Sequence, residues 1–137
     1  MRIFVYFLFF LGSLPCVSFA KSTEAIFLDI ENMYATIDAT LHLPKQPTGI
    51  AVVHAHTWSN LLAAFPAVGL AEKRYAVLSL DVRGANKAEG QPDEIFEMFL
   101  LDVAAGVQEM KDRGYEKIIL LGGSSGAPLM ACYQNVA

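Results

Sequence analysis

The chain has 137 residues, which is the usual size of a single domain, and 54% of them are hydrophobic. Lys and Arg number 10 against 14 Asp and Glu, which gives a formal net charge of −4. The basic residues form no cluster along the sequence, so we expect no nucleic-acid partner.

Residues 1–20 have the pattern of a secretory signal peptide. Arg2 precedes an unbroken apolar run, and the small residues Ser18 and Ala20 suit a cleavage site. The alternative is a membrane anchor, but the run is shorter than the about 20 residues of a spanning helix. We predict cleavage after Ala20, a secreted or periplasmic protein, and no stable membrane span after signal removal. Cys132 is then the only cysteine left, and its small apolar neighbours indicate a buried thiol.

The first part of the mature chain has the patterns of β-strands. Alternating apolar residues predict strands at 25–31 and 34–43, joined by a turn at Glu31-Asn32. Residues 44–49 are rich in turn formers, and residues 49–56 form a nearly continuous apolar run. Such a run is typical of a strand that is buried on both faces of a parallel sheet.

A helix is predicted within residues 57–74, where a polar residue precedes an apolar stretch. Its N-cap is Thr57, Ser59 or Asn60, and Pro66 suits its first turn because proline lacks the N–H that this turn leaves unpaired.

Strands and helices continue to alternate in the second half. Residues 74–81 predict a buried strand, 82–94 a polar loop, 117–121 another buried strand, and 125–137 a helix of small residues. The most regular helix is predicted at 92–114. Apolar residues recur along one side of it: Phe96, Phe99, Leu100, Val103, Val107 and Met110.

This order of elements predicts an α/β fold. We expect a mostly parallel sheet, helices on both of its faces, and an antiparallel hairpin at the N-terminal edge. Functional residues of such sheets gather at the carboxyl ends of the strands. Three segments of this sequence meet there: residues 54–60, 81–90 and 122–128.

The segment "GGSSGAP" matches the pattern G-x-S-x-G between an apolar strand and a helix. In this pattern the serine occupies a sharp turn, and the residues two positions away must be small because strand and helix nearly touch there. Gly122 and Gly126 flank Ser124 in this way, so the spacing selects Ser124 over Ser125. The alternatives are a plain glycine-rich turn and a phosphate-binding loop, although the lysine of a Walker A loop is missing.

The segments "VVHAH", "LSLDVRGANKAEG" and "IILLGGSSGAPL" together resemble the α/β-hydrolase family, over about residues 25–137. The resemblance implies that Ser124 is the nucleophile and that the backbone amides of Ser125 and His56 form the oxyanion hole. It makes His54 a structural residue at the end of a strand. Three further residues would shape the loop beside the site: Asp81, Arg83 and Gly84. Three positions depart from the residues usual in the family: Ala55, Gly123 and Ala127.

No histidine or carboxylate follows Ser124 in the sequence, although the family order is Ser, then Asp or Glu, then His. His54 or His56 is an alternative base, and His42 is expected to be a strand residue. We interpret the chain as the N-terminal part (residues 21–137) of an incomplete α/β-hydrolase domain, inactive alone, with acid and base downstream.

The predicted function is therefore a serine hydrolase that acts on a small-molecule carboxylic ester or amide. Neither a cofactor nor a metal is expected, because His54 and His56 lack a third ligand, and no oligomeric state is predicted. Two alternatives stay open: a non-catalytic binding or scaffold protein with this fold, and a periplasmic domain that binds an anion in its glycine-rich loop.

Overall fold

The computed structural model describes residues 23–32, 35–58, 61, 65–83 and 96–137, so the predicted signal peptide and Gly84 lie outside it. Within these ranges the chain forms five strands and three helices. In chain order they are β1 (Thr23–Glu31), β2 (Thr36–Pro44), β3 (Ile50–His54), α1 (Phe65–Glu72), β4 (Ala76–Asp81), α2 (Phe96–Asp112), β5 (Lys117–Leu121) and α3 (Gly126–Val136).

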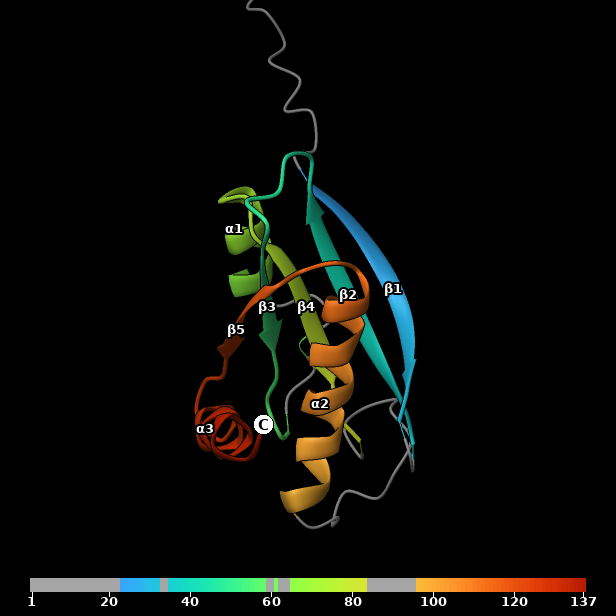
Figure 1. Ribbon diagram of the computed structural model, residues 1–137, viewed down its shortest axis with the longest axis vertical. Helices are drawn as coiled ribbons and strands as arrows, with labels where there is room; N and C mark the ends of the chain where they lie inside the picture. The colour runs from blue at the N-terminus through green and yellow to red at the C-terminus, as the bar shows by residue number, and fades with distance from the viewer. Residues whose placement is uncertain (1–22, 33–34, 59–60, 62–64, 84–95) are drawn as a thin grey trace, which may run out of the picture.

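The strands form one sheet in the order β1-β2-β4-β3-β5 (Figure 1). β1 and β2 pair antiparallel, with Thr23 opposite Pro44 and Glu31 opposite Thr36, which confirms the predicted pairing. β3 lies parallel to both β4 and β5. β2, however, is antiparallel to β4. The α/β class is thus confirmed, but the sheet is mixed rather than mostly parallel, because the hairpin joins it through a second antiparallel pairing.

Helices cover both faces of the sheet. Alternate residues of β3 point to opposite sides: Val53 belongs to the main core under α2 and α3, whereas Val52 packs with Ala67 and Ala71 of α1. β4 is buried along its whole length. β5 is the outer strand and is only partly covered, with Ile119 47% exposed. Figure 1 shows α2 lying across one face and α3 at the end where the parallel strands terminate.

α3 lies inside its predicted range, whereas α1 covers only part of the predicted range 57–74, because the described residues 57–58 and 61 are not helical. α2 lies inside the predicted range, and its buried stripe includes the polar Asp102 beside Phe99 and Val103. Pro66 is the second residue of α1, as expected. The predicted cap residues Ser59 and Asn60 lie outside the described residues. Cys132 was expected to be buried but is exposed, because α3 directs Leu129 and Met130 to the core instead.

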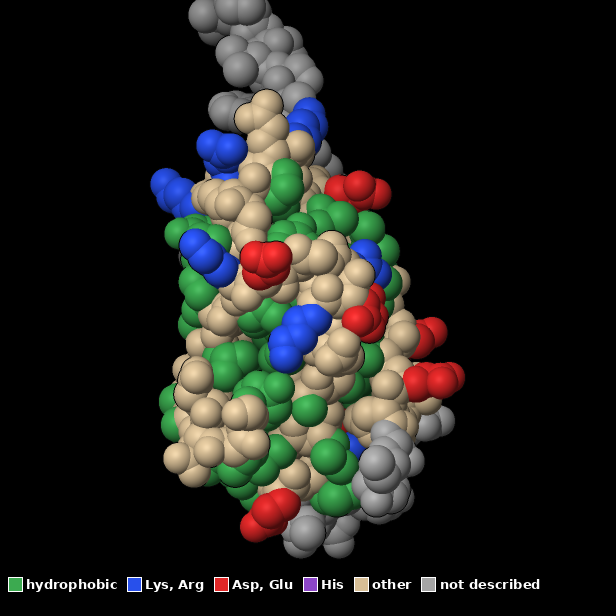
Figure 2. All heavy atoms as spheres, in the orientation of Figure 1, with side chains coloured by type: hydrophobic (Ala, Val, Ile, Leu, Met, Phe, Trp, Pro, Cys, Tyr) green, Lys and Arg blue, Asp and Glu red, His purple; other side chains and the backbone are tan. Residues whose placement is uncertain are grey.

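The described surface is mixed in charge. On the face drawn in Figure 2, several Lys and Arg side chains lie in the upper part, and most of the acidic side chains lie toward the middle and the right. No helix among the described residues is long and apolar enough to cross a membrane.

Candidate active site

The turn between β5 and α3 is sharp, and Ser124 occupies its bend. Ser124 has φ +49°, in the left-handed region that residues other than glycine seldom adopt. Two backbone hydrogen bonds close the turn, from Gly126 N–H to Gly123 O (2.8 Å) and from Ala127 N–H to Ser124 O (3.1 Å). Ser125 already has helical angles, φ −64° and ψ −20°. Of the two serines in the turn, only Ser124 is therefore held in an unusual conformation, and it is exposed.

The two outer glycines of the motif lie against backbone atoms. A Cβ at Gly122 would overlap the carbonyl group of Gly126, and a Cβ at Gly126 would overlap the carbonyl oxygen of Ala55. A Cβ at Gly123 would meet nothing within 4 Å. The G-x-S-x-G spacing is thus required by the close approach of strand, helix and the loop after β3.

Alanine substitutions at these three glycines should change the free energy of unfolding by different amounts. We expect Gly126→Ala and Gly122→Ala to lower the free energy of unfolding by about 1–3 kcal/mol, because backbone atoms cannot rotate out of the way. Gly123→Ala is the matched control and should change it by less than about 0.5 kcal/mol. Urea unfolding of the full-length protein measures all three. Equal effects at Gly123 and Gly126 would contradict the packing described.

The loop after β3 brings a second backbone amide to this turn. Ala55 N–H donates to Leu121 O (3.2 Å), which extends the pairing of β3 with β5 by one residue. The next residue, His56, lies directly against α3, since its Cα would be 3.2 Å from a Cβ at Gly126. Within the described part of the chain, neither His56 N–H nor Ser125 N–H has a hydrogen-bond acceptor. Two open backbone donors therefore lie on adjoining segments beside Ser124.

Thr57 makes a side-chain contact across the same two segments. Its hydroxyl donates to Ser125 Oγ at 2.6 Å, and the residue is buried. Thr57 was predicted as a possible helix cap, but its hydroxyl binds the turn at α3 instead. No local pattern predicts this contact, because the two residues are 68 positions apart. Ser125 is the N-cap residue of α3, but its hydroxyl makes no hydrogen bond to the first turn of that helix, and only the structure reveals this.

The histidine predicted as an alternative base does not contact Ser124. His56 Nδ1 accepts a hydrogen bond from Trp58 N–H (3.0 Å), so this nitrogen carries a lone pair and the neutral ring is protonated at Nε2. Both ring nitrogens lie 3.4–3.5 Å from Ser125 Oγ, which is the outer limit of hydrogen bonding. Among the described residues, the Ser124 hydroxyl has no hydrogen-bond partner.

His54 is buried at the carboxyl end of β3. Burial, and secondarily the neighbouring His56, lower the pKa of His54 from its usual 6.5. In the described part of the chain its Nδ1 has no hydrogen-bond partner. The ring is therefore neutral in the folded protein near neutral pH, as expected for a histidine that is buried at the last position of a strand.

Several solved structures similar to this chain are hydrolases or esterases by name. XC6422 from Xanthomonas campestris, an α/β serine hydrolase without a lid, matches with a TM-score of 0.74 and 17% identity over 82% of this chain and 56% of its own. Est1E from Butyrivibrio proteoclasticus, solved with ferulic acid, matches with a TM-score of 0.69 and 20% identity over 80% and 47%. The Pyrococcus furiosus esterase Pf2001 matches with a TM-score of 0.65 and 24% identity over 80% and 45%.

This chain has the α/β-hydrolase fold. It spans about half the length of the solved structures that it matches. No protein-family model matches the sequence, and no curated protein does.

In this α/β-hydrolase fold, two of the residues predicted to shape the site, Asp81 and Arg83, lie at or just after the end of β4. Asp81 and Arg83 are both fully buried. Arg83 contacts Asp102 of α2 through its side chain (Nη2 to Oδ1, 2.8 Å) and its backbone N–H (to Oδ2, 2.8 Å). Asn32 joins this cluster from the end of β1, donating to Asp102 at 2.6 Å and accepting from Arg83 at 3.0 Å. Arg83 thus links the end of β4 to α2 and to the end of β1, through partners that the sequence pattern did not predict.

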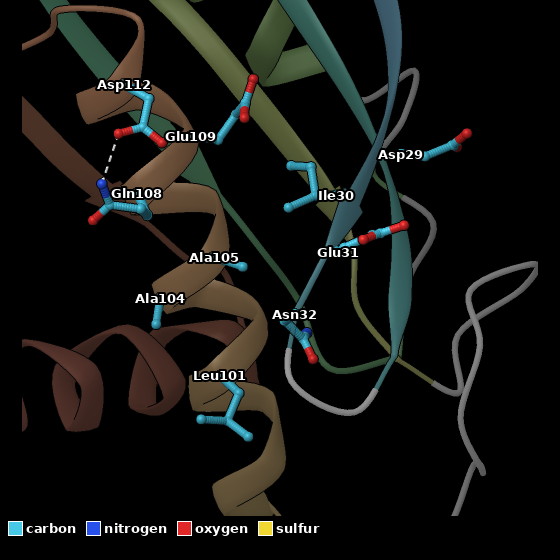
Figure 3. A pocket seen from close by; sticks show the side chains of 10 residues that line it. All are labelled: Asp29, Ile30, Glu31, Asn32, Leu101, Ala104, Ala105, Gln108, Glu109 and Asp112. Carbon is cyan, nitrogen blue, oxygen red and sulfur yellow. Dashed lines mark hydrogen bonds between the residues drawn. The ribbon is translucent and has the colours of Figure 1, made fainter.

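A hollow of about 490 Å³ lies between β1 and α2, away from the β5–α3 turn (Figure 3). Acidic residues line it, but Asp29 and Glu31 point away from the helix. Gln108 donates to Asp112 on the helix side at 2.8 Å. The carboxylates that line the hollow therefore do not point toward one common position. The β5–α3 turn is the better candidate site of this α/β-hydrolase fold.

The low pKa of His54 gives a pH dependence of stability. Because the unfolded chain binds a proton on this ring below pH 6.5 and the folded protein does not, stability should fall as pH is lowered through 6.5. The slope is at most about 1.4 kcal/mol per pH unit. Urea unfolding of the full-length protein and of His54→Gln checks this: the acid-dependent loss should be smaller in the variant. Equal losses would contradict it.

Proposed function

We propose that this chain carries the nucleophile and the oxyanion donors of a serine hydrolase for small-molecule carboxylic esters or amides. The observation that carries the proposal is the position of Ser124. Its residue is exposed at φ +49°, without a hydrogen-bond partner among the described residues. The backbone N–H of the next residue, Ser125, and that of His56, which lies against Gly126 of the same turn, also lack acceptors there. The esterase names of the similar structures support the same chemistry.

In the proposed reaction, Ser124 Oγ attacks the carbonyl carbon of the substrate and its proton passes to a base. The C=O electron pair moves onto oxygen, and the resulting oxyanion accepts hydrogen bonds from the Ser125 and His56 amides. Collapse of this intermediate expels the alcohol or amine and leaves an acyl-serine, which water then hydrolyses. The location of the amides at the N-terminal end of α3 also favours negative charge at that point.

The base and its orienting carboxylate are proposed to come from sequence C-terminal to Ala137. Within the described residues no histidine contacts Ser124, and His56 Nδ1 is already occupied by Trp58 N–H. A serine hydroxyl without a base is a weak nucleophile, so residues 21–137 alone should be inactive. The predicted signal peptide adds the proposal that the mature enzyme works outside the cytoplasm.

A fluorophosphonate probe tests this function on the full-length protein. The proposal expects covalent labelling, with the modified peptide containing Ser124 when the labelled protein is digested and analysed by mass spectrometry. Labelling at another residue would show that the nucleophile is not Ser124. A well-folded full-length protein that does not label at all would instead support the alternative of a non-catalytic binding or scaffold protein.

A further inference from the structure

We propose that Thr57 is a positioning residue, which holds the two oxyanion amides in register through its hydrogen bond to Ser125. The inference rests on the proposed function, because it assigns Thr57 a part in the same oxyanion hole. Thr57 directly follows His56, which supplies one amide, and Ser125 supplies the other. The side-chain hydrogen bond of 2.6 Å from Thr57 therefore joins Ser125 to the residue next to His56, and it is much shorter than the 3.4–3.5 Å contacts of the His56 ring with the same hydroxyl.

The backbone contacts of the loop explain why such a bond is needed. Pairing with β5 ends at Ala55, whose N–H donates to Leu121 O. The following His56 N–H has no backbone partner in the described part of the chain, so backbone hydrogen bonds do not fix its direction. The β3–β5 pairing restrains the loop before this amide, at Ala55, and the Thr57 contact to Ser125 restrains it after this amide.

Burial and the use of the Ser125 hydroxyl both indicate a specific contact. Thr57 is 3% exposed, so its hydroxyl would be left unsatisfied without Ser125. Ser125 occupies the N-cap position of α3, where a serine hydroxyl commonly accepts from the first turn of its own helix. Here it makes no such cap bond and accepts from Thr57 instead.

The expected effect follows from how an oxyanion hole works. Its donors stabilise the transition state only when they point at the developing charge, and loss of one whole donor lowers kcat about 100- to 1,000-fold. Removing the Thr57 hydroxyl leaves both amides present but lets one of them move. We therefore expect Thr57→Val to lower kcat about tenfold, with KM changed less than about twofold.

The experiment measures p-nitrophenyl ester hydrolysis by the full-length protein and its inhibition by a boronic acid that mimics the tetrahedral intermediate. Thr57→Val and Ser125→Ala should each lower kcat about tenfold and weaken the boronic acid by a similar factor. The double variant should be no worse than either single one, because both remove the same bond. Thr57→Ser should recover most of the lost rate. Thr40→Val is the matched control: Thr40 is a buried threonine of β2, and its hydroxyl has no partner among the described residues.

Each outcome decides the inference. Independent, multiplying losses in the double variant would overturn it, as would a Thr57→Val enzyme with unchanged kcat. A loss of kcat in Thr40→Val as large as in Thr57→Val would reduce the effect to general destabilisation and would also overturn it. Ser124→Ala, measured in the same series, distinguishes a failure of the proposed function from a failure of the inference about Thr57. If hydrolysis persists without Ser124, the proposed function fails and the inference fails with it. If hydrolysis depends on Ser124 but not on Thr57, only the inference fails.

Discussion

Replacing Ser124 by alanine in the full-length protein is expected to lower kcat for ester hydrolysis by at least about 10⁴-fold, because the acyl-enzyme can no longer form. The same substitution at Ser125 is the matched comparison, since it removes an adjacent hydroxyl and should reduce kcat only about tenfold. Initial rates with a p-nitrophenyl ester measure both. Loss of fluorophosphonate labelling should accompany Ser124→Ala alone.

The two variants also distinguish a chemical effect from a structural one. Ser124 is exposed, so its truncation should change the free energy of unfolding by less than about 0.5 kcal/mol. A larger kinetic loss in Ser125→Ala than in Ser124→Ala would mean that the motif spacing selects the wrong serine. Equal, severe losses of both activity and stability would mean that the turn itself had been disrupted.

The second large effect is expected at the buried ion pair between β4 and α2. Asp102→Ala should lower the free energy of unfolding by about 3–5 kcal/mol, because it removes the carboxylate that faces a buried guanidinium. The Arg83 and Asp102 side chains are both fully buried, and Arg83 contacts the carboxylate through Nε, Nη2 and its backbone N–H. Urea unfolding at neutral pH measures the loss.

A partly exposed ion pair at the C-terminal end of the same helix provides the control. Arg113 and Glu109 contact each other at 2.7 Å with about a third of each side chain exposed, so Glu109→Ala should cost less than about 1 kcal/mol. Replacing Arg83 and Asp102 together by Met and Leu should be less damaging than Asp102→Ala, because no lone charge stays buried. A small loss in Asp102→Ala would show that other groups satisfy Arg83.

Local patterns in the sequence predicted the elements well, because periodicity and turn residues act over a few positions. The G-x-S-x-G spacing also predicted which glycines the backbone requires, since close approach at Gly122 and Gly126 follows from the shape of the turn itself. The antiparallel pairing of β2 with β4 was not predicted. Apolar patterns indicate that a strand is buried, but they do not say which strand lies beside it or in which direction.

The contacts that depend on distant residues were missed for the same reason. Arg83 and Asp102 are 19 positions apart and meet only once α2 packs on the sheet. One signal was nevertheless present: Asp102 interrupts the apolar stripe of a helix between Phe99 and Gly106, and a buried carboxylate needs a partner. Thr57 carried no comparable signal, because threonine is ordinary in a loop that precedes a helix.

The pairing of β3 with β5 has a consequence for how this site is assembled during folding. Ile50 pairs with Lys117, 67 positions along the chain, whereas Thr36 and Glu31 of the hairpin are only five apart. Closing the longer loop costs more chain entropy and contributes to a higher contact order. The Ser124 turn follows β5 and His56 follows β3, so this pairing brings the two segments together. We therefore expect the hydrolytic geometry to mature after the hairpin, so that partly folded chains present no working nucleophile.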